Sequence, residues 1–198
     1  MNPWDERYSV EGFVYGREPN DFLLEQESRI PRGGRVLCLA EGEGRNAVFL
    51  AGKGHSVLAV DQSSVGLNKL HRLAHEMGVR IETLCCDLAH FQIEAAGFDA
   101  IVSIWCHVPI ELRRKLHADC VQGLKSGGVL ILEAYHPKQL KYGTGGPPTA
   151  ELMMTAQDLN REFLGLHPWI SCERERAVYE GTHHVGLSFV TQWAGMKP

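Results

Sequence analysis

The sequence has no long hydrophobic run, no surplus of basic residues and no paired-cysteine motif. Each absence argues against a class of protein. No apolar run approaches the roughly 18 residues of a membrane-spanning helix, and the opening Met-Asn-Pro-Trp-Asp-Glu-Arg is not typical of a signal peptide. The net charge of -4 gives no electrostatic footprint for nucleic acid or an anionic membrane. The six cysteines include no C-x-x-C pair. We therefore expect a cytoplasmic protein whose partner is a small molecule, not a nucleic acid or a membrane.

The chain does have a regular alternation of short apolar runs and amphipathic stretches. We predict strands over 35–39, 55–60, 80–85, 98–104 and 127–134, with helices between them. Continuous apolar runs are typical of parallel strands buried on both faces. Two further extended stretches, 167–178 and 185–193, are joined by a short link and are therefore antiparallel neighbours. The pattern predicts an α/β fold in which a mainly parallel sheet with helices on both faces ends in a C-terminal hairpin.

A glycine turn follows the first predicted strand. Gly42, Gly44 and Ala47 match G-x-G-x-x-G/A, in which glycines allow the backbone to approach a ligand at a helix N-terminus. The same residues would also serve a tight strand-to-helix turn without a ligand. Two carboxylates favour a ligand. Asp61 ends the second strand, where it would accept the ribose hydroxyls, and Asp87 closes the third, where it would accept from an adenine amino group.

The remaining length argues against a dinucleotide. A nicotinamide enzyme normally needs a second mononucleotide half or a separate catalytic domain. After the fourth strand this chain has one more strand, a helix and a hairpin. S-adenosylmethionine requires only an adenosine site, a place for the methionine zwitterion and space at the sulfonium. We therefore predict S-adenosylmethionine as the cofactor and no metal.

The order of these motifs resembles that of class I S-adenosylmethionine-dependent methyltransferases over essentially the whole chain. The resemblance implies a single domain over 1–198 with the Rossmann-like methyltransferase fold and a seven-stranded sheet, in which residues 1–30 form an N-terminal lid or cap. More narrowly, four stretches are similar to a bacterial branch related to tellurite-resistance and thiol methyltransferases: LCLAEGEGRNAVFLA (37–51), VYGREPNDFL (14–23), SIWCHVP (103–109) and EAYHPKQLKYGTGGPP (133–148).

The chain departs from the family pattern at its first motif. Cys38 stands where the family usually carries an acidic residue, and Ala40 stands at the first of three spaced glycines. Glu41 is the nearest carboxylate, and we hypothesise that it pairs with the methionine ammonium instead. The cofactor-binding set that the resemblance implies is Ala40, Glu41, Gly42, Gly44, Arg45, Asn46, Asp61, Gln62, Cys86, Asp87, Leu88 and Ile104.

The residues expected beyond the carboxyl ends of the strands supply the catalytic candidates. His107 is the first candidate for a general base and His184 the second, with Tyr15 and Arg17 as covering or substrate-contacting groups. The glycine–proline loop at 142–148 is placed to act as a lid. The [DN]-P-P-[FYW] signature of methyltransferases that grip an amino group is absent, which disfavours DNA bases as acceptors.

The predicted reaction is therefore methyl transfer to a small molecule. From the resemblance, the leading acceptor is a thiol or a chalcogen oxyanion. A small oxygen acceptor, a non-catalytic S-adenosylmethionine-binding protein and a nicotinamide oxidoreductase stay open as alternatives.

Overall fold

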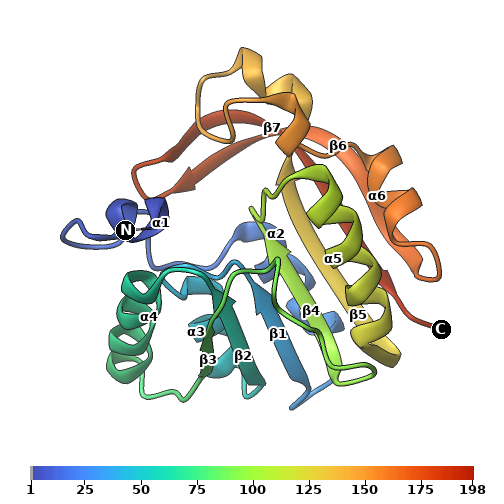
Figure 1. Cartoon of the computed structure of the whole chain (residues 1–198), viewed down its shortest axis with the longest axis horizontal. Helices are drawn as coiled ribbons and strands as arrows, with labels where there is room; N and C mark the ends of the chain where they lie inside the picture. Colours follow the sequence, from blue (N-terminus) through green and yellow to red (C-terminus); the bar gives the residue numbers. More distant parts are fainter. Residues whose placement is uncertain (1) are drawn as a thin grey trace.

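The computed structural model describes residues 2–198, and one seven-stranded sheet forms its centre (Figure 1). The strand order is β3-β2-β1-β4-β5-β7-β6, and β7 alone runs opposite to the other six strands. This confirms the predicted mainly parallel sheet with a C-terminal hairpin. The strands are β1 (Arg35–Leu39), β2 (Ser56–Asp61), β3 (Glu82–Cys85), β4 (Phe98–Ile104), β5 (Leu124–Tyr135), β6 (His167–Glu180) and β7 (His184–Met196).

Helices cover both faces of the sheet. On β1, Val36 and Cys38 face a core shared with α2, α3 and α4, whereas Leu37 and Leu39 face a core shared with α5 and α6. This two-sided burial explains why the strand sequence is continuously apolar. The helices are α1 (Pro3–Tyr8), α2 (Asp21–Gln26), α3 (Arg45–Gly52), α4 (Ser64–Glu76), α5 (Ile110–Gly123) and α6 (Ala156–Glu162), with short 3₁₀ turns η1 (Glu27–Arg29), η2 (Pro137–Lys141) and η3 (Ala150–Leu152).

Several element ends lie at the predicted residues. The strands β1 and β4 have the predicted bounds, and Ser63 caps α4 by accepting from the Gly66 amide. Thr155 and Asp158 form a capping box before α6. The fifth strand begins three residues earlier than predicted, because Leu124 already pairs with Phe98 across a register shift.

The N-terminal helices α1 and α2 were not predicted. Each has six residues, too few for an apolar period to be recognised. Asn2 caps α1 by accepting from the Trp4 amide, and Pro3 occupies its first turn. Within residues 2–198, no helix is long and apolar enough to cross a membrane.

The β6–β7 hairpin returns to the same edge of the sheet as the glycine turn. Its tip reaches the N-terminal segment near α1 (Figure 1), where the Thr182 amide donates to the Val14 carbonyl at 2.9 Å. Gly181 has φ 62°, and a Cβ there would lie 2.0 Å from the Val14 oxygen. Only glycine therefore permits this contact between two segments that are far apart in the sequence.

Candidate active site

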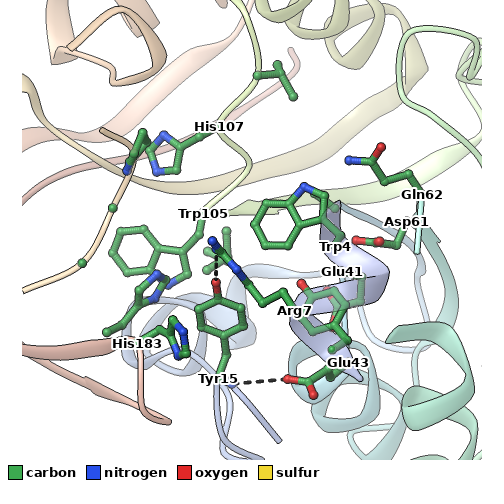
Figure 2. Close-up of a pocket in the computed structure, with 18 of the residues that line it drawn as sticks. Trp4, Arg7, Tyr15, Glu41, Glu43, Asp61, Gln62, Trp105, His107 and His183 are labelled. Carbon is green, nitrogen blue, oxygen red and sulfur yellow. Dashed lines mark hydrogen bonds between the residues drawn. The ribbon is translucent and has the colours of Figure 1, made fainter. Parts of the chain in front are cut away.

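The carboxyl ends of the parallel strands meet at one edge of the sheet. Leu39 pairs with Val60 on β2 and with Ser103 on β4, so the residues that follow these strands emerge side by side. Above this edge lies a cavity of about 430 Å³, within the usual range for small-molecule sites. Its walls are the N-terminal segment up to Gly16, the strand ends, the 145–148 loop and the hairpin turn (Figure 2).

The glycine turn uses left-handed backbone at three positions. Ala40, Gly42 and Gly44 have φ values of 51°, 60° and 93°. Ala40 is one of three non-glycine residues in the described chain with positive φ, which explains why methyltransferases usually carry glycine at this position. The Glu41 side chain then caps α3, because its Oε1 accepts from the Ala47 amide at 2.7 Å.

Gly44 tests how tightly this turn is packed. A Cβ at Gly44 would lie 2.3 Å from Leu70 Cγ, in addition to the strain of its left-handed backbone. Gly44→Ala should therefore lower the free energy of unfolding by about 2–4 kcal/mol, measured by urea denaturation. Gly52→Ala is the matched control: nothing lies within 4 Å of its added Cβ, and stability should stay level or rise by up to about 1 kcal/mol. Equal losses in both variants would contradict the packing explanation.

Glu41 is a buried carboxyl that lines the cavity. Its Oε1 accepts a hydrogen bond from the Ala47 amide at 2.7 Å. Burial raises the pKa of Glu41 to about 7, and the Ala47 amide and the Arg45 charge only partly oppose this. A cationic ligand group beside Glu41 would therefore restore its charge.

Asp61 and Asp87 line the cavity as predicted, and both also make local hydrogen bonds. Asp61 accepts from the Gly42 amide at 2.8 Å and from the Ser63 amide at 2.7 Å, one at each oxygen. Each oxygen keeps a second lone pair that a ligand hydroxyl would use. Burial raises the pKa of Asp61, and these two amides oppose the shift. Asp87 accepts from the Ala89 amide, so it also stabilises its own turn.

Arg45 and Asn46 lie in the first turn of α3, and protein partners occupy both. Arg45 forms a buried ion pair with Glu180 at 2.6 Å. Asn46 accepts from the Asn20 amide at 2.9 Å. Both residues line the cavity, and Glu180 already balances the Arg45 charge.

Glu180 belongs to a buried charge network behind the cavity. Burial alone would raise the pKa of Glu180, but hydrogen bonding to His184, the Arg45 charge and the Trp105 indole hold that pKa below its usual range. A second carboxylate, Glu133, is fully buried and receives both Arg176 Nε and Nη2, at 2.8 and 2.6 Å. Two arginines thus balance two glutamates.

His107, the first candidate base, has both ring nitrogens occupied by backbone groups. Nδ1 lies 2.8 Å from the Leu152 carbonyl oxygen, and Nε2 accepts from the Tyr135 amide at 3.3 Å. Burial lowers the pKa of His107 to about 4. The ring lines the cavity but has no nitrogen free for a substrate proton. The His107 ring thus holds the η3 turn against β5, and a role for it as the base stays a prediction.

His184 has the geometry that His107 lacks. Its buried Nδ1 lies 3.5 Å from Glu180 Oε2 and has no closer partner among the described residues. Its ring packs against Tyr15 at 4.7 Å and Trp105 at 5.2 Å between ring centres. Burial lowers the pKa of His184, with Glu180 opposing the shift. At neutral pH the ring is therefore an uncharged proton acceptor that lines the cavity.

The N-terminal wall contains residues that the sequence reading missed. Trp4, Arg7 and Tyr8 on α1 line the cavity, and Figure 2 shows Trp4 and Arg7 extending across it. The sequence feature that could have identified them is the concentration of aromatic residues near the N-terminus. The predicted lid over 1–30 has two parts. Its first part, with α1, lines the cavity, whereas Phe22 and Leu23 on α2 belong to the core beneath the sheet.

The cavity gathers most of the predicted site. Ten of the twelve predicted cofactor residues line it, as do Tyr15, His107 and His184. Gly42 and Cys86 do not. Gly42 lies under the Tyr8 hydroxyl and donates to Asp61, and Cys86 donates to the Asp87 carbonyl. These two residues shape the turns, and ligand contact by the other ten stays a prediction.

Comparison with known proteins agrees with this geometry. Residues 36–128 match the family model described as a methyltransferase domain. A curated relative, the uncharacterized methyltransferase YbaJ of Bacillus subtilis, is 32% identical over 116 residues, which cover 57% of this chain and 45% of the relative. The match thus spans less than half of that relative's length.

Solved structures show the same fold over nearly the whole chain. TehB from Haemophilus influenzae has a TM-score of 0.74 at 16% identity, covering 98% of this chain and 66% of its own. The Burkholderia thailandensis 1,6-didemethyltoxoflavin-N1-methyltransferase, solved with S-adenosylhomocysteine, has a TM-score of 0.64 at 18% identity, covering 90% and 78%. Residues 36–128 therefore resemble a methyltransferase domain, and the chain shares the Rossmann-like fold of these solved methyltransferase structures.

Proposed function

We propose that this chain transfers a methyl group from S-adenosylmethionine to a small acceptor, with a thiol or chalcogen oxyanion as the leading class. The observation that carries the proposal is the cavity itself. It joins Glu41, Asp61 and Asp87 around a left-handed glycine turn to a second half walled by Trp105 and His184. The first half fits a cationic nucleoside, and the second fits a compact acceptor.

The protein groups suit S-adenosylmethionine at three points. The Glu41 carboxylate would receive the methionine ammonium, and the remaining lone pairs of Asp61 would receive the ribose hydroxyls. Asp87 would accept from the adenine amino group. The strand order supports the same choice, because the antiparallel strand β7 lies next to β5, where a dinucleotide fold carries its last parallel strand.

The second half of the cavity supplies a base and a dry wall. When bound, S-adenosylmethionine supplies an electrophilic methyl group on a sulfonium. His184 would accept the proton of the acceptor S–H or O–H as the new bond to carbon forms, and Glu180 would hold the ring and stabilise the resulting imidazolium. Trp105 and the 145–148 loop would exclude water from the reacting atoms.

Two acceptor classes use this base to different degrees. A thiol ionises near neutrality and needs little help, whereas an alcohol or phenol depends on the base. The resemblance to tellurite-resistance and thiol methyltransferases and the fold shared with TehB support the soft acceptor. The buried Glu180–His184 pair supports an oxygen acceptor, which is therefore the second candidate.

Binding of S-adenosylmethionine should depend on the charge of Glu41. Because the pKa of Glu41 is about 7 without a ligand, pairing with the ammonium should release a proton, and affinity should fall as the pH drops below about 7. Glu41→Gln keeps an oxygen for the Ala47 amide and removes the charge. Its Kd above pH 7 should rise about tenfold and lose this pH dependence, as measured by isothermal titration at several pH values.

The same titration separates the alternative functions. S-adenosylmethionine and S-adenosylhomocysteine should bind in the wild type and NADH should not. Binding of NADH alone, or of none of the three, would remove the basis for the cofactor assignment. Binding without turnover of any thiol, selenite, tellurite or phenol would favour a non-catalytic binding protein. A Glu41→Gln variant with wild-type affinity would remove Glu41 from the ammonium site.

A further inference from the structure

Arg7 brings a positive charge to the cavity without an acidic partner. It lies in the last turn of α1 and lines the cavity. Its Nη1 donates to the Tyr15 hydroxyl at 3.0 Å, and its guanidinium lies 4.8 Å from the centre of the Trp4 ring. Among residues 2–198 it forms no ion pair, whereas Arg45, the other arginine of the cavity, is paired with Glu180. Arg7 is thus held in place by uncharged groups.

The carboxylates of the cavity are engaged elsewhere. Glu43 pairs with Lys69 at 2.8 Å, and Asp61 accepts two backbone amides. Glu41 and Asp87 each accept a backbone amide of the adjoining turn. Among residues 2–198, no carboxylate therefore forms an ion pair with Arg7. A ligand anion beside it would gain a charge-assisted hydrogen bond without displacing an existing ion pair.

Tyr15 adds a second donor at the same place. Burial raises the pKa of Tyr15, and the hydrogen bond from Arg7 only partly opposes the shift, so the phenol keeps its proton. Its oxygen accepts from Arg7, which leaves the O–H free to donate. Figure 2 shows the Arg7 and Tyr15 side chains meeting inside the cavity, close to Trp105. A planar guanidinium beside a phenol O–H matches a carboxylate.

The aromatic wall relates this donor pair to the proposed base. The Tyr15 ring packs against His184, and the Tyr15 hydroxyl accepts from Arg7. Tyr15 therefore contacts both the donor group Arg7 and the proposed base. The Trp105 ring, stacked on Tyr135 with 4.3 Å between ring centres, adds an apolar surface beside them.

We propose that Arg7 and Tyr15 form a carboxylate-binding subsite for the acceptor. The acceptor is then a small acid with a short apolar body, whose carboxylate is bound at Arg7 and whose thiol or hydroxyl lies at His184. This inference rests on the proposed function for the role of the ligand as acceptor, but anion binding at Arg7 is measurable without turnover.

The test compares a carboxylate with a neutral molecule of the same shape. Benzoate and benzamide are titrated into the protein saturated with S-adenosylhomocysteine, and into the protein alone, for the wild type, Arg7→Gln, Arg7→Lys and Arg17→Gln. Arg17 is the matched control, because it lies on the same segment, is half-exposed and pairs with Glu76 away from the cavity. We expect wild type and Arg17→Gln to bind benzoate about tenfold more tightly than benzamide. Arg7→Gln should lose this preference and Arg7→Lys should keep part of it.

The outcomes distinguish a role of Arg7 in binding the methyl acceptor from a role in binding the cofactor. Unchanged S-adenosylhomocysteine affinity in Arg7→Gln, together with a lost benzoate preference, supports the subsite. Loss of S-adenosylhomocysteine affinity with the benzoate preference intact would place Arg7 on the cofactor carboxylate and overturn the proposal. No preference in the wild type would also overturn it. If S-adenosylhomocysteine fails to bind, the proposed function fails, and the titrations of the protein alone still decide the subsite. Turnover of mercaptoacetate against mercaptoethanol then shows whether the preference extends to substrates.

Discussion

Replacing His184 by glutamine should lower kcat by about 10²–10⁴-fold with an alcohol or phenol acceptor. The reason is its position: the ring lines the cavity, Glu180 lies 3.5 Å from Nδ1, and burial keeps the ring neutral. With a thiol acceptor the loss should be much smaller, because a thiolate needs no base. A large loss of kcat in His184→Gln therefore indicates an oxygen acceptor, and a small loss indicates a thiol.

The pH profile gives an independent test of the same residue. A base must be unprotonated, so wild-type kcat/KM for the acceptor, measured at saturating S-adenosylmethionine, should be full above the pKa of His184 and fall tenfold per pH unit below it. That pKa lies below the usual value of 6.5. His184→Gln should lose this acid limb. His107→Gln is the matched comparison: it should lower stability through the lost bonds to Leu152 and Tyr135 but retain the limb. Loss of the acid limb of the kcat/KM profile in His107→Gln alone would identify His107 as the base.

The second large effect concerns the buried charge network. Arg176→Met removes the partner of the fully buried Glu133 and one contact of Glu180. An uncompensated buried carboxylate typically costs about 3–5 kcal/mol, so the free energy of unfolding should fall by that amount in urea denaturation. Arg174→Met is the control, since Arg174 is exposed on the same strand and makes no ion pair within residues 2–198.

The sign of the pH dependence identifies the cause of that loss. In Arg176→Met the buried Glu133 loses its counter-charge, so the destabilisation should be largest at high pH and shrink as the pH falls. Adding Glu133→Gln should recover part of the lost stability, because it removes the unpaired charge. A double variant less stable than Arg176→Met at every pH would show that packing, not charge, dominates at this position.

The sequence by itself determined the local elements and the class of the fold. Continuous apolar runs such as 98–104 and capping residues such as Ser63 act through neighbours close in the chain, so their signal is local. The left-handed glycine turn and the strand-end carboxylates Asp61 and Asp87 are equally local, because a strand end in a parallel sheet always opens at the ligand edge. The sequence alone therefore predicts these positions.

Only the tertiary structure decided which side chains are free to act. His107 and His184 are the same residue type at similar places beyond the strands, yet backbone groups from η3 and β5 occupy one ring, whereas Glu180 approaches the other. Arg7 became a candidate because every nearby carboxylate found another partner. These outcomes depend on contacts between residues far apart in the chain, and no local pattern encodes them. The physical reason is that a group's charge and availability are set by burial and partners in three dimensions.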